Sequence, residues 1–330
     1  MLTIDIWRDE MKIFWKLLLL GSGLIAALLI FSTFYHMYQL RNEAKKYPPP
    51  GKLVTIDNNK MHIYSDGQGD ITLVFMAGSG TSSPTIDFKP LWSKLLDEYK
   101  ITVVEKAGYG WSEESAVSAD IEKMLEKTRK ALKLSGEDGP YVLVPHSMSG
   151  LEAIYWAQKY PDEIRAIIGL DPAIPDHYLN SSFKLPSKSQ LYIMYFMSRI
   201  GLTRFMGRSE LEKNLSLLKS KDLTVEDKEK LTAIFYKSSL TKNMLNEIDY
   251  IKENASKVKR NGIPSDIPMY FFIAENSDLS IIPNWTADLS KYLDEVKSGN
   301  YKMLETGHYV HHEKSDLIAH EIKRFLREKF

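Results

Sequence analysis

The ten residues YVLVPHSMSG, Tyr141 to Gly150, decide the fold of this 330-residue chain. An apolar run ends at Pro145, and a helical pattern begins almost at once, over Gly150–Lys159. A strand that passes into a helix through so short a turn holds the central side chain of the turn outward on strained backbone. The stretch therefore predicts an outward-facing side chain at Ser147, the centre of the turn.

The centre of the turn follows from the size of its neighbours, because the strand and the helix collide unless the residues two positions away are small. Around Ser147 these are Pro145 and Ser149, whereas a turn centred on Ser149 would have bulky Leu151 in that position. A nucleophilic serine also needs a base and an oxyanion site, and the N–H of Met148 is the natural first oxyanion donor. Taken alone, the stretch leaves an ordinary serine N-cap as the alternative.

Strand-like and helical stretches alternate on both sides of this turn. The expected strands are 52–57, 60–65, 71–76, 101–105, 141–145, 165–170, 268–274 and 300–304, with helices over 90–99, 119–134, 150–159, 283–296 and 313–330. The first two strands flank Asn58-Asn59 and read as a hairpin, and the helices between the others indicate a mostly parallel sheet covered on both faces. From about 176 to 262 the pattern is helical throughout. We therefore expect an α/β fold with an eight-stranded sheet and a helical cap inserted after strand six.

The N-terminal part of the chain predicts a membrane anchor, because residues 17–40 contain no Lys, Arg, Asp or Glu. At about 1.5 Å per residue this run can cross a hydrocarbon core of about 30 Å, and Trp15, Tyr35 and Tyr38 lie where interfacial aromatic residues occur. No small-residue cleavage site follows it, which favours an uncleaved anchor over a signal peptide. We expect a tail over 1–16, a transmembrane helix over 17–40, a linker over 41–51 and one α/β domain over 52–330.

The positive-inside rule does not determine the orientation of this helix in the membrane, because basic residues flank both ends of the apolar run. The short segment before the run favours a single-pass protein of the cell membrane whose domain lies outside the cytoplasm.

The composition excludes several classes of protein. The chain has 43 Lys+Arg and 43 Asp+Glu, so it lacks the positive charge on which nucleic-acid binding depends. Apolar residues make up 44%, which excludes a disordered chain. The absence of cysteine excludes disulfides, thiol nucleophiles and thiolate metal sites. His308 and His312 are four residues apart but lack the Glu of H-E-x-x-H, so we expect no metal and no cofactor.

Several motifs together resemble the α/β-hydrolase superfamily, and in particular its membrane-anchored members whose domain opens with PPPG. The opening is Pro48–Val54, PPPGKLV, followed by Met61–Tyr64, MHIY. Further on come Phe75–Gly80, FMAGSG, and Glu105–Ser112, EKAGYGWS, and the pattern ends at Thr306-Gly307-His308. The resemblance covers nearly everything after the apolar run except the helical insertion.

The resemblance implies a Ser-His-Asp triad in the chain order serine, acid, histidine. It assigns the nucleophile to Ser147 and the general base to His308. For the acid it favours Asp278 in the loop after strand seven, although Asp278 comes one residue later than the usual spacing. Asp171, after strand six, and Glu275 are the alternatives.

The resemblance also implies that the loop after the third strand supplies the second oxyanion N–H. In this chain that loop is Ala77–Gly80, with Ala77 where the family has histidine, and the donor by position is the backbone N–H of Ser79.

The expected function is that of a membrane-anchored serine hydrolase. It would attack an ester, thioester or amide through an acyl-enzyme, with a carboxylesterase- or lipase-like activity on apolar acyl substrates. The alternatives are a catalytically silent binding protein of the same fold tethered to the membrane, and an aminopeptidase-type hydrolase. The expected partners are a small-molecule substrate and the lipid bilayer, with no nucleic acid. The apolar run Leu191–Met197, LYIMYFM, could line the substrate pocket, form the core of the cap, or contact the bilayer.

Overall fold

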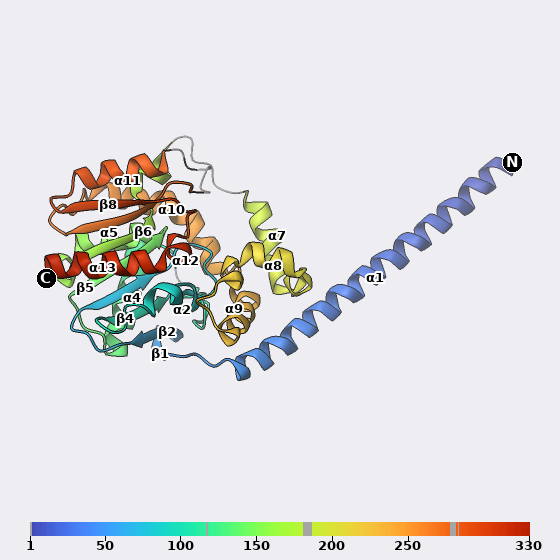
Figure 1. Cartoon of the computed structure of the whole chain (residues 1–330). Helices are drawn as coiled ribbons and strands as arrows, with labels where there is room; N and C mark the ends of the chain where they lie inside the picture. The colour runs from blue at the N-terminus through green and yellow to red at the C-terminus, as the bar shows by residue number, and fades with distance from the viewer. Residues whose placement is uncertain (1, 117, 181–186, 278–281, 283) are drawn as a thin grey trace.

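A computed structural model describes residues 2–116, 118–180, 187–277, 282 and 284–330 (Figure 1). Its centre is one eight-stranded sheet with the strand order β1-β2-β4-β3-β5-β6-β7-β8. The strands are β1 Lys52–Ile56, β2 Asn59–Asp66, β3 Thr72–Met76, β4 Lys100–Glu105, β5 Tyr141–Ser147, β6 Ile164–Pro172, β7 Met269–Ala274 and β8 Gly299–Leu304. The β1–β2 and β2–β4 pairs are antiparallel and all the other pairs are parallel. The predicted fold, with its opening hairpin and its eight strands, is confirmed.

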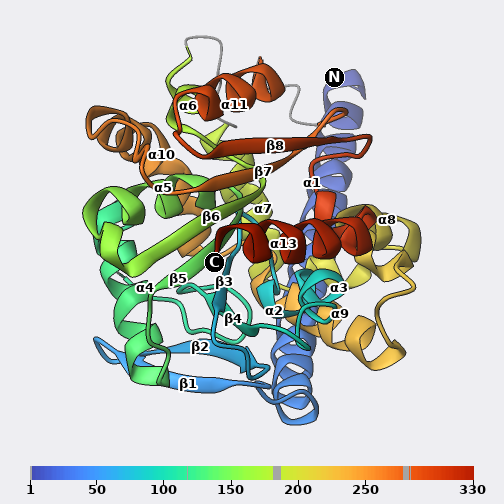
Figure 2. The same cartoon turned by 60° about the vertical axis from the view of Figure 1, so that its left-hand side comes forward.

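Helices cover both faces of the sheet (Figure 2). One face packs on α4 (Ile121–Ser135), α5 (Ser149–Lys159) and α11 (Trp285–Asp294), and the other on α2 (Pro84–Asp87), α3 (Lys89–Trp92), α12 (Val310–Glu313) and α13 (Ser315–Lys329). The central strands β3 and β7 are buried along their whole length. Burial on both faces explains why these strands read as continuous apolar runs.

One predicted helix is much shorter than expected. The apolar spacing predicted a helix over 90–99, but α3 ends at Trp92, and the chain continues in tight turns in which Lys94 N–H bonds Leu91 O and Leu95 N–H bonds Trp92 O. Leu91 and Leu95 are both fully buried in this arrangement. The apolar pattern correctly predicted that these leucines are buried, but the backbone that buries them forms i→i+3 turns in place of a longer α-helix.

The insertion between β6 and β7 is helical where it is described. It contains α6 (Pro175–Leu179), α7 (Lys188–Arg199), α8 (Arg208–Asn214), α9 (Val225–Ser238) and α10 (Lys242–Arg260), with short 3-10 turns η2 (Leu202–Phe205) and η3 (Ser216–Lys219). Helix α9 begins with a capping box, since Thr224 Oγ1 accepts from Asp227 N–H and Thr224 N–H donates to Asp227 Oδ2. We call this insertion, residues 175–260, the cap.

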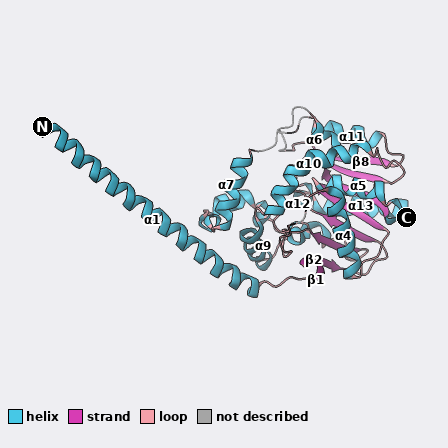
Figure 3. Ribbon diagram, turned by 180° about the vertical axis from the view of Figure 1, so that it is seen from behind, coloured by secondary structure: helices cyan, strands magenta, loops and turns pink. Residues whose placement is uncertain are grey.

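The N-terminal helix α1, Leu2–Lys46, extends the predicted anchor in both directions (Figures 1 and 3). Its segment Glu10–Lys46 is the one helix among the described residues that is long and apolar enough to cross a membrane. Residues 11–28 are exposed, whereas Ser32 and His36 are buried against the cap. The helix continues through residues 41–46, which the sequence analysis assigned to the linker, and Glu43 and Lys46 in its last turn contact the cap.

The buried carboxylate of Glu105, at the end of β4, joins the segments that carry the PPPG, MHIY and AGYGWS motifs. Its Oε2 accepts from Trp111 N–H at 2.7 Å and from His62 Nδ1 at 2.9 Å, and its Oε1 accepts from Thr85 N–H and Oγ1. The other ring nitrogen of His62, Nε2, accepts from Gly51 N–H at 2.9 Å. His62 is therefore the neutral Nδ1–H tautomer, and these motifs owe their spacing to one hydrogen-bond network.

We expect Glu105→Gln to destabilise the fold, although the two side chains have nearly the same size. In Glu105→Gln one acceptor oxygen becomes an NH2 donor that faces the N–H donors of the network, and leaving such buried groups unsatisfied costs about 3 kcal/mol. We expect the free energy of unfolding of the full chain in detergent micelles to fall by about this amount. The control is Glu295→Gln on the exposed surface, and equal stability of the two variants would contradict the assignment.

Candidate active site

The predicted turn lies at the carboxyl end of β5, in the middle of the sheet. Ser147 has a positive φ of 53°, which a non-glycine residue adopts only under strain. Its side chain is half-buried, whereas its neighbours in the turn are buried. The close approach of α5 to β6 requires glycine at Gly150, because a Cβ there would lie 2.2 Å from the carbonyl oxygen of Ala173. The turn therefore has the strained, outward geometry that the sequence predicted for Ser147.

Ser149, the competing serine, has a structural role. Its Oγ accepts from His146 N–H at 3.0 Å and donates to the carbonyl oxygen of Met76 at 2.6 Å. Because Met76 ends β3, this hydroxyl ties the nucleophile turn to the start of the neighbouring loop. The sequence analysis expected a small residue at position 149. The hydroxyl of Ser149 is in addition occupied by these hydrogen bonds.

The loop after β3 approaches Ser147 closely enough to serve as an oxyanion site. A Cβ on Gly78 would lie 2.6 Å from Ser147 Cβ and 3.3 Å from Ser147 Oγ, so only glycine fits there. The expected donors, the N–H groups of Ser79 and Met148, follow Gly78 and Ser147 directly in the chain. The backbone at Gly78 therefore lies against the Ser147 side chain, and the roles of Ser79 and Met148 as oxyanion donors remain predictions.

Tyr109 braces this loop, and the sequence analysis did not single it out. Its hydroxyl donates to Glu247 Oε2 on α10 at 2.8 Å, and Ser79 and Gly80 lie close enough to the phenol to affect its pKa. Burial, and then the charge of Glu247, raise the pKa of the phenol well above its usual value, so that it stays protonated. Tyr109 thereby links the oxyanion loop to the cap, and its place in the AGYGWS motif was the available signal.

His308, the expected base, contacts an acid through one ring nitrogen. Its Nδ1 lies 2.6 Å from Asp171 Oδ2, and its Nε2 is buried and has no hydrogen-bond partner among the described residues. A histidine held through Nδ1–H by a carboxylate presents the lone pair of Nε2 to a nucleophile. The free nitrogen is therefore the one that a general base uses.

The acid in contact with His308 is Asp171, an alternative in the sequence analysis. The favoured residue, Asp278, lies outside the described residues. Glu275 is exposed at the end of β7, and its only described hydrogen bond runs from its own N–H to the carbonyl oxygen of Leu304. The signal that pointed to Asp171 was its place directly after a buried strand, as part of Gly169-Leu170-Asp171.

Asp171 is positioned by three hydrogen bonds and by strained backbone. Its Oδ1 accepts from Ala274 N–H at 3.1 Å and from Trp285 Nε1–H at 3.0 Å, while its Oδ2 faces His308. Its φ is 45°, so both it and Ser147 adopt strained conformations at the ends of adjacent strands. Three donors stabilise the charged carboxylate in its fully buried position.

Two further histidines support the site while remaining neutral. His146 packs its ring against the His308 ring, with centroids 4.6 Å apart, and its Nε2 lies 3.3 Å from the His308 carbonyl oxygen. His177 stacks on Trp285 at 3.9 Å. Burial lowers the pKa of His146 well below its usual value and that of His177 to about 3. Both rings thus hold the His308–Asp171 pair in place without adding charge.

A second polar cluster lies behind the site, and sequence reasoning missed it. His311 Nε2 and His312 Nε2 lie 2.9 and 3.1 Å from the two oxygens of Asp87. Burial opposes ionisation of Asp87, but the charge of His312 and the hydrogen bonds of both histidines hold the pKa of the carboxyl well below its usual range. These three residues form the described group whose ligand atoms, all within 4.8 Å of one another, could share a metal ion. Their mutual hydrogen bonds already satisfy the carboxylate.

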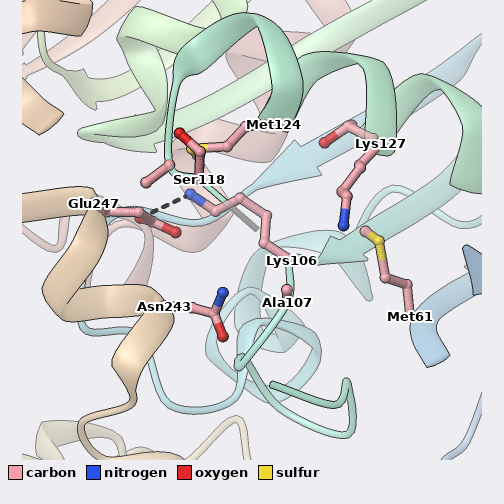
Figure 4. A pocket seen from close by; sticks show the side chains of 10 residues that line it. Met61, Lys106, Ala107, Ser118, Met124, Lys127, Asn243 and Glu247 are labelled. Atoms are coloured by element: carbon pink, nitrogen blue, oxygen red, sulfur yellow. Dashed lines mark hydrogen bonds and ion pairs between the residues drawn. The ribbon is translucent and has the colours of Figure 1, made fainter. Parts of the chain in front are cut away.

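A cavity of about 20 Å³ lies against Met148 and Ser149, and two larger cavities lie near the site. One, of about 260 Å³, is enclosed between the loop that starts at Gly80, the residue Tyr309 next to the base, and the cap segments η3 and α9. The other, of about 40 Å³, lies under α10, where the Lys106 ammonium points toward Glu247 at 3.1 Å (Figure 4). The smaller of these two has room for about one water, which occupies ~30 Å³ in the liquid, so the larger is the candidate for the substrate.

The model of the alpha/beta hydrolase fold family matches residues 73–314. The chain belongs to the α/β-hydrolase fold family. This α/β hydrolase is 36% identical over 327 residues to the uncharacterized protein YbdG of Bacillus subtilis (strain 168), with 96% of this chain and 99% of that protein covered.

Solved structures share the fold of this α/β hydrolase. A Vigna radiata epoxide hydrolase mutant aligns over 84% of this chain and 98% of its own, with a TM-score of 0.64 and 16% identity. The enol-lactonase from Burkholderia xenovorans LB400 aligns over 84% and 100%, with a TM-score of 0.59 and 15% identity. At these identities the likeness concerns the fold.

The low pKa of His177 makes the stability of this α/β hydrolase depend on pH. An unfolded histidine takes up a proton near pH 6.5, whereas His177 in the fold does so only near pH 3. The unfolded state binds more protons between these values, so stability is fully present above pH 6.5 and falls as the pH is lowered toward 3, by about 1.36 kcal/mol per pH unit for one proton. We expect His177→Gln to reduce the pH slope of the unfolding free energy by about one proton in this window.

The matched control for that measurement is His320→Gln, because His320 is exposed in α13. Urea unfolding at a series of pH values gives the slope for each variant. An unchanged slope in His177→Gln would show that His177 takes up its proton in the fold as readily as in the unfolded chain.

Proposed function

We propose that this protein is a serine hydrolase in which Ser147 is the nucleophile, His308 the general base and Asp171 the acid that orients His308. The observation that carries the proposal is the 2.6 Å contact between His308 Nδ1 and Asp171 Oδ2, which leaves His308 Nε2 buried and unpartnered. The strained turn at Ser147 and the membership in a hydrolase family support it.

In the proposed reaction Ser147 Oγ attacks the acyl carbon of an ester, thioester or amide while its proton passes to His308 Nε2. The oxyanion accepts hydrogen bonds from the N–H groups of Ser79 and Met148, and Asp171 stabilises the imidazolium. Collapse of the tetrahedral intermediate transfers the proton to the leaving group and forms the acyl-enzyme. Water then attacks the acyl-enzyme and gives its proton to His308 Nε2. As the second tetrahedral intermediate collapses, His308 returns this proton to Ser147 Oγ, and the acid and the free serine are released.

The volume of the larger cavity supports a small acyl group as the part of the substrate that binds there. The cap contributes four apolar side chains to the lining, Leu215, Leu217, Leu231 and Phe235. The polar side chains of the lining include the hydroxyls from Thr81 to Ser83 together with Asp87, Lys213 and His312. The apolar run 191–197, which the sequence analysis considered as a pocket lining, is not part of that lining. Epoxide opening, as named for the Vigna radiata neighbour, would require a carboxylate nucleophile at the turn, where this chain has Ser147.

Kinetic variants test the triad directly. Asp171→Asn should lower kcat for p-nitrophenyl butyrate by about 10⁴-fold, because the wrong tautomer of His308 is then favoured. Ser147→Ala should abolish both turnover and covalent labelling by a fluorophosphonate. Asp278→Asn is the matched control and should retain turnover.

Two results would contradict this assignment. Loss of activity in Asp278→Asn with retention in Asp171→Asn would transfer the acid role to Asp278. A folded wild-type protein that neither turns over esters nor takes up fluorophosphonate would indicate the silent binding protein instead.

We further propose that α1 anchors the hydrolase in a membrane as a single-pass helix. The support is its length, its apolar composition and the exposure of residues 11–28, which no other described part of the chain covers. From Trp15 to Tyr35 the helix rises about 30 Å, the thickness of a hydrocarbon core.

Membrane fractionation tests the anchor. The full chain should stay in the pellet after carbonate extraction, whereas a variant that starts at Phe31 should be released, because it keeps the docked part of α1 and lacks most of the apolar span. Recovery of the full chain in the soluble fraction would refute the anchor.

A further inference from the structure

We infer that the outer face of α7 and the adjoining turn η2 form a second membrane contact, embedded at the boundary of the bilayer that α1 enters. The inference rests on the proposed anchor and adds to it a surface of the cap. The surface consists of Tyr192, Ile193, Met194, Phe196, Met197 and Phe205, which we call the outer apolar face.

The outer apolar face is turned away from the protein. Its six side chains are between 40% and 58% exposed, although all are large and apolar. Ser198, by contrast, lies on the inner side of α7. It is buried, and its Oγ lies 2.9 Å from Ser239 Oγ. A helix that buries its serine and exposes its Ile, Met and Phe residues is amphipathic with respect to an apolar exterior. The run therefore forms neither the core of the cap nor the lining of a described cavity.

The cap is fixed to α1 immediately beside this face. Ser32 Oγ donates to the carbonyl oxygen of Ile200, the residue that follows α7, at 2.6 Å. The guanidinium of Arg204, in η2, donates to both oxygens of Glu43, at 2.7 and 2.6 Å, and to His36 Nδ1 at 2.8 Å. A Cβ on Gly201 would lie 2.4 Å from His36 Cβ. These contacts bury the polar groups of this part of α1 and determine where the outer apolar face lies along it.

The position along α1 corresponds to the edge of the hydrocarbon core. Trp15 and Tyr35 are twenty residues apart, about 30 Å of helix, so the two aromatic side chains fit the two interfaces. The ring of Phe205 lies 6.1 Å from the ring of Tyr35. The outer apolar face thus begins at the level of Tyr35, on the side of the domain that the free part of α1 leaves (Figures 1 and 3). Lipid at this level is the apolar phase available to cover it.

The absence of cysteine from the chain makes the inference testable by single-site labelling. In the full chain, reconstituted into phosphatidylcholine vesicles, Ile193→Cys and Met197→Cys are each labelled with the fluorophore NBD and exposed to lipids that carry a doxyl quencher at a shallow position. Leu24→Cys in α1 is the control for the anchor, with a quencher at the middle of the acyl chain. Leu134→Cys, on an exposed apolar residue of α4, is the matched control for a surface in water.

We expect the labels at 193 and 197 to lose roughly half of their emission to the shallow quencher, as for side chains that lie ~5–10 Å deep at the acyl boundary, and the label at 134 to lose none. Quenching at 24 without quenching at 193 and 197 would overturn the inference and leave the anchor standing. Lack of quenching at 24 would overturn the anchor, and the inference with it. Emission at 193 that shifts with protein density and ignores the quencher would identify a second copy of the chain as the occupant, and would also overturn it. Circular dichroism checks that each variant is folded.

Discussion

The buried negative charge of Glu105 is the constraint on which the arrangement of the domain depends. A carboxylate without water must be neutralised by donors, and the donors come from segments that are distant in the chain: His62 in the hairpin, Thr85 after the oxyanion loop and Trp111 after β4. Gly110 leaves the space, since a Cβ there would lie 2.0 Å from Glu105 Oε2. One buried group therefore determines how the hairpin, the oxyanion loop and the linker meet.

The parallel sheet explains why the proposed catalytic groups meet although they are far apart in sequence. The pairing of β5 with β6 shifts by one residue at this end, since His146 lies opposite Leu170 and Ser147 opposite Pro172. Asp171 is the extra residue between these two pairs, and Ala173 N–H donates to Ser147 O at 2.7 Å. Ser147 and Asp171 consequently lie at the same edge of the sheet. Their strained backbone conformations cost of order 1–3 kcal/mol each, and the close packing of Gly150 on Ala173 and of Gly78 on Ser147 keeps them in place.

The parts of this arrangement that could be predicted are those encoded in local sequence. The strands followed from short apolar runs, and Ser147 and His308 followed from local motifs whose residues are adjacent in the chain. Spacing left the acid open between Asp171 and Asp278, because both residues come after strands; the described residues bring Asp171 into contact with His308, and the prediction of Asp278 is not tested. The pairing of Asp87 with His311 joins residues 224 positions apart, and no local pattern marks it. The predicted helix over 90–99 was too long because i→i+3 turns bury the same leucines as a helix does.

The run Leu191–Met197 shows a deeper limit of sequence patterns. Periodicity reports that one side of a helix is apolar, but the same pattern serves a core, a pocket or a membrane surface. The surroundings of the run determine which of these roles it has. Ser198 is directed inward and Arg204 binds Glu43 of α1, so that most side chains of the run remain on the surface. The following cap segment reaches the cavity beside the active site through Leu215 and Leu217. Because fewer than twenty residues separate Ile200, which contacts α1, from Leu217 at the cavity, the proposed membrane helix and the wall of the proposed substrate site are held by the same short segment of the cap.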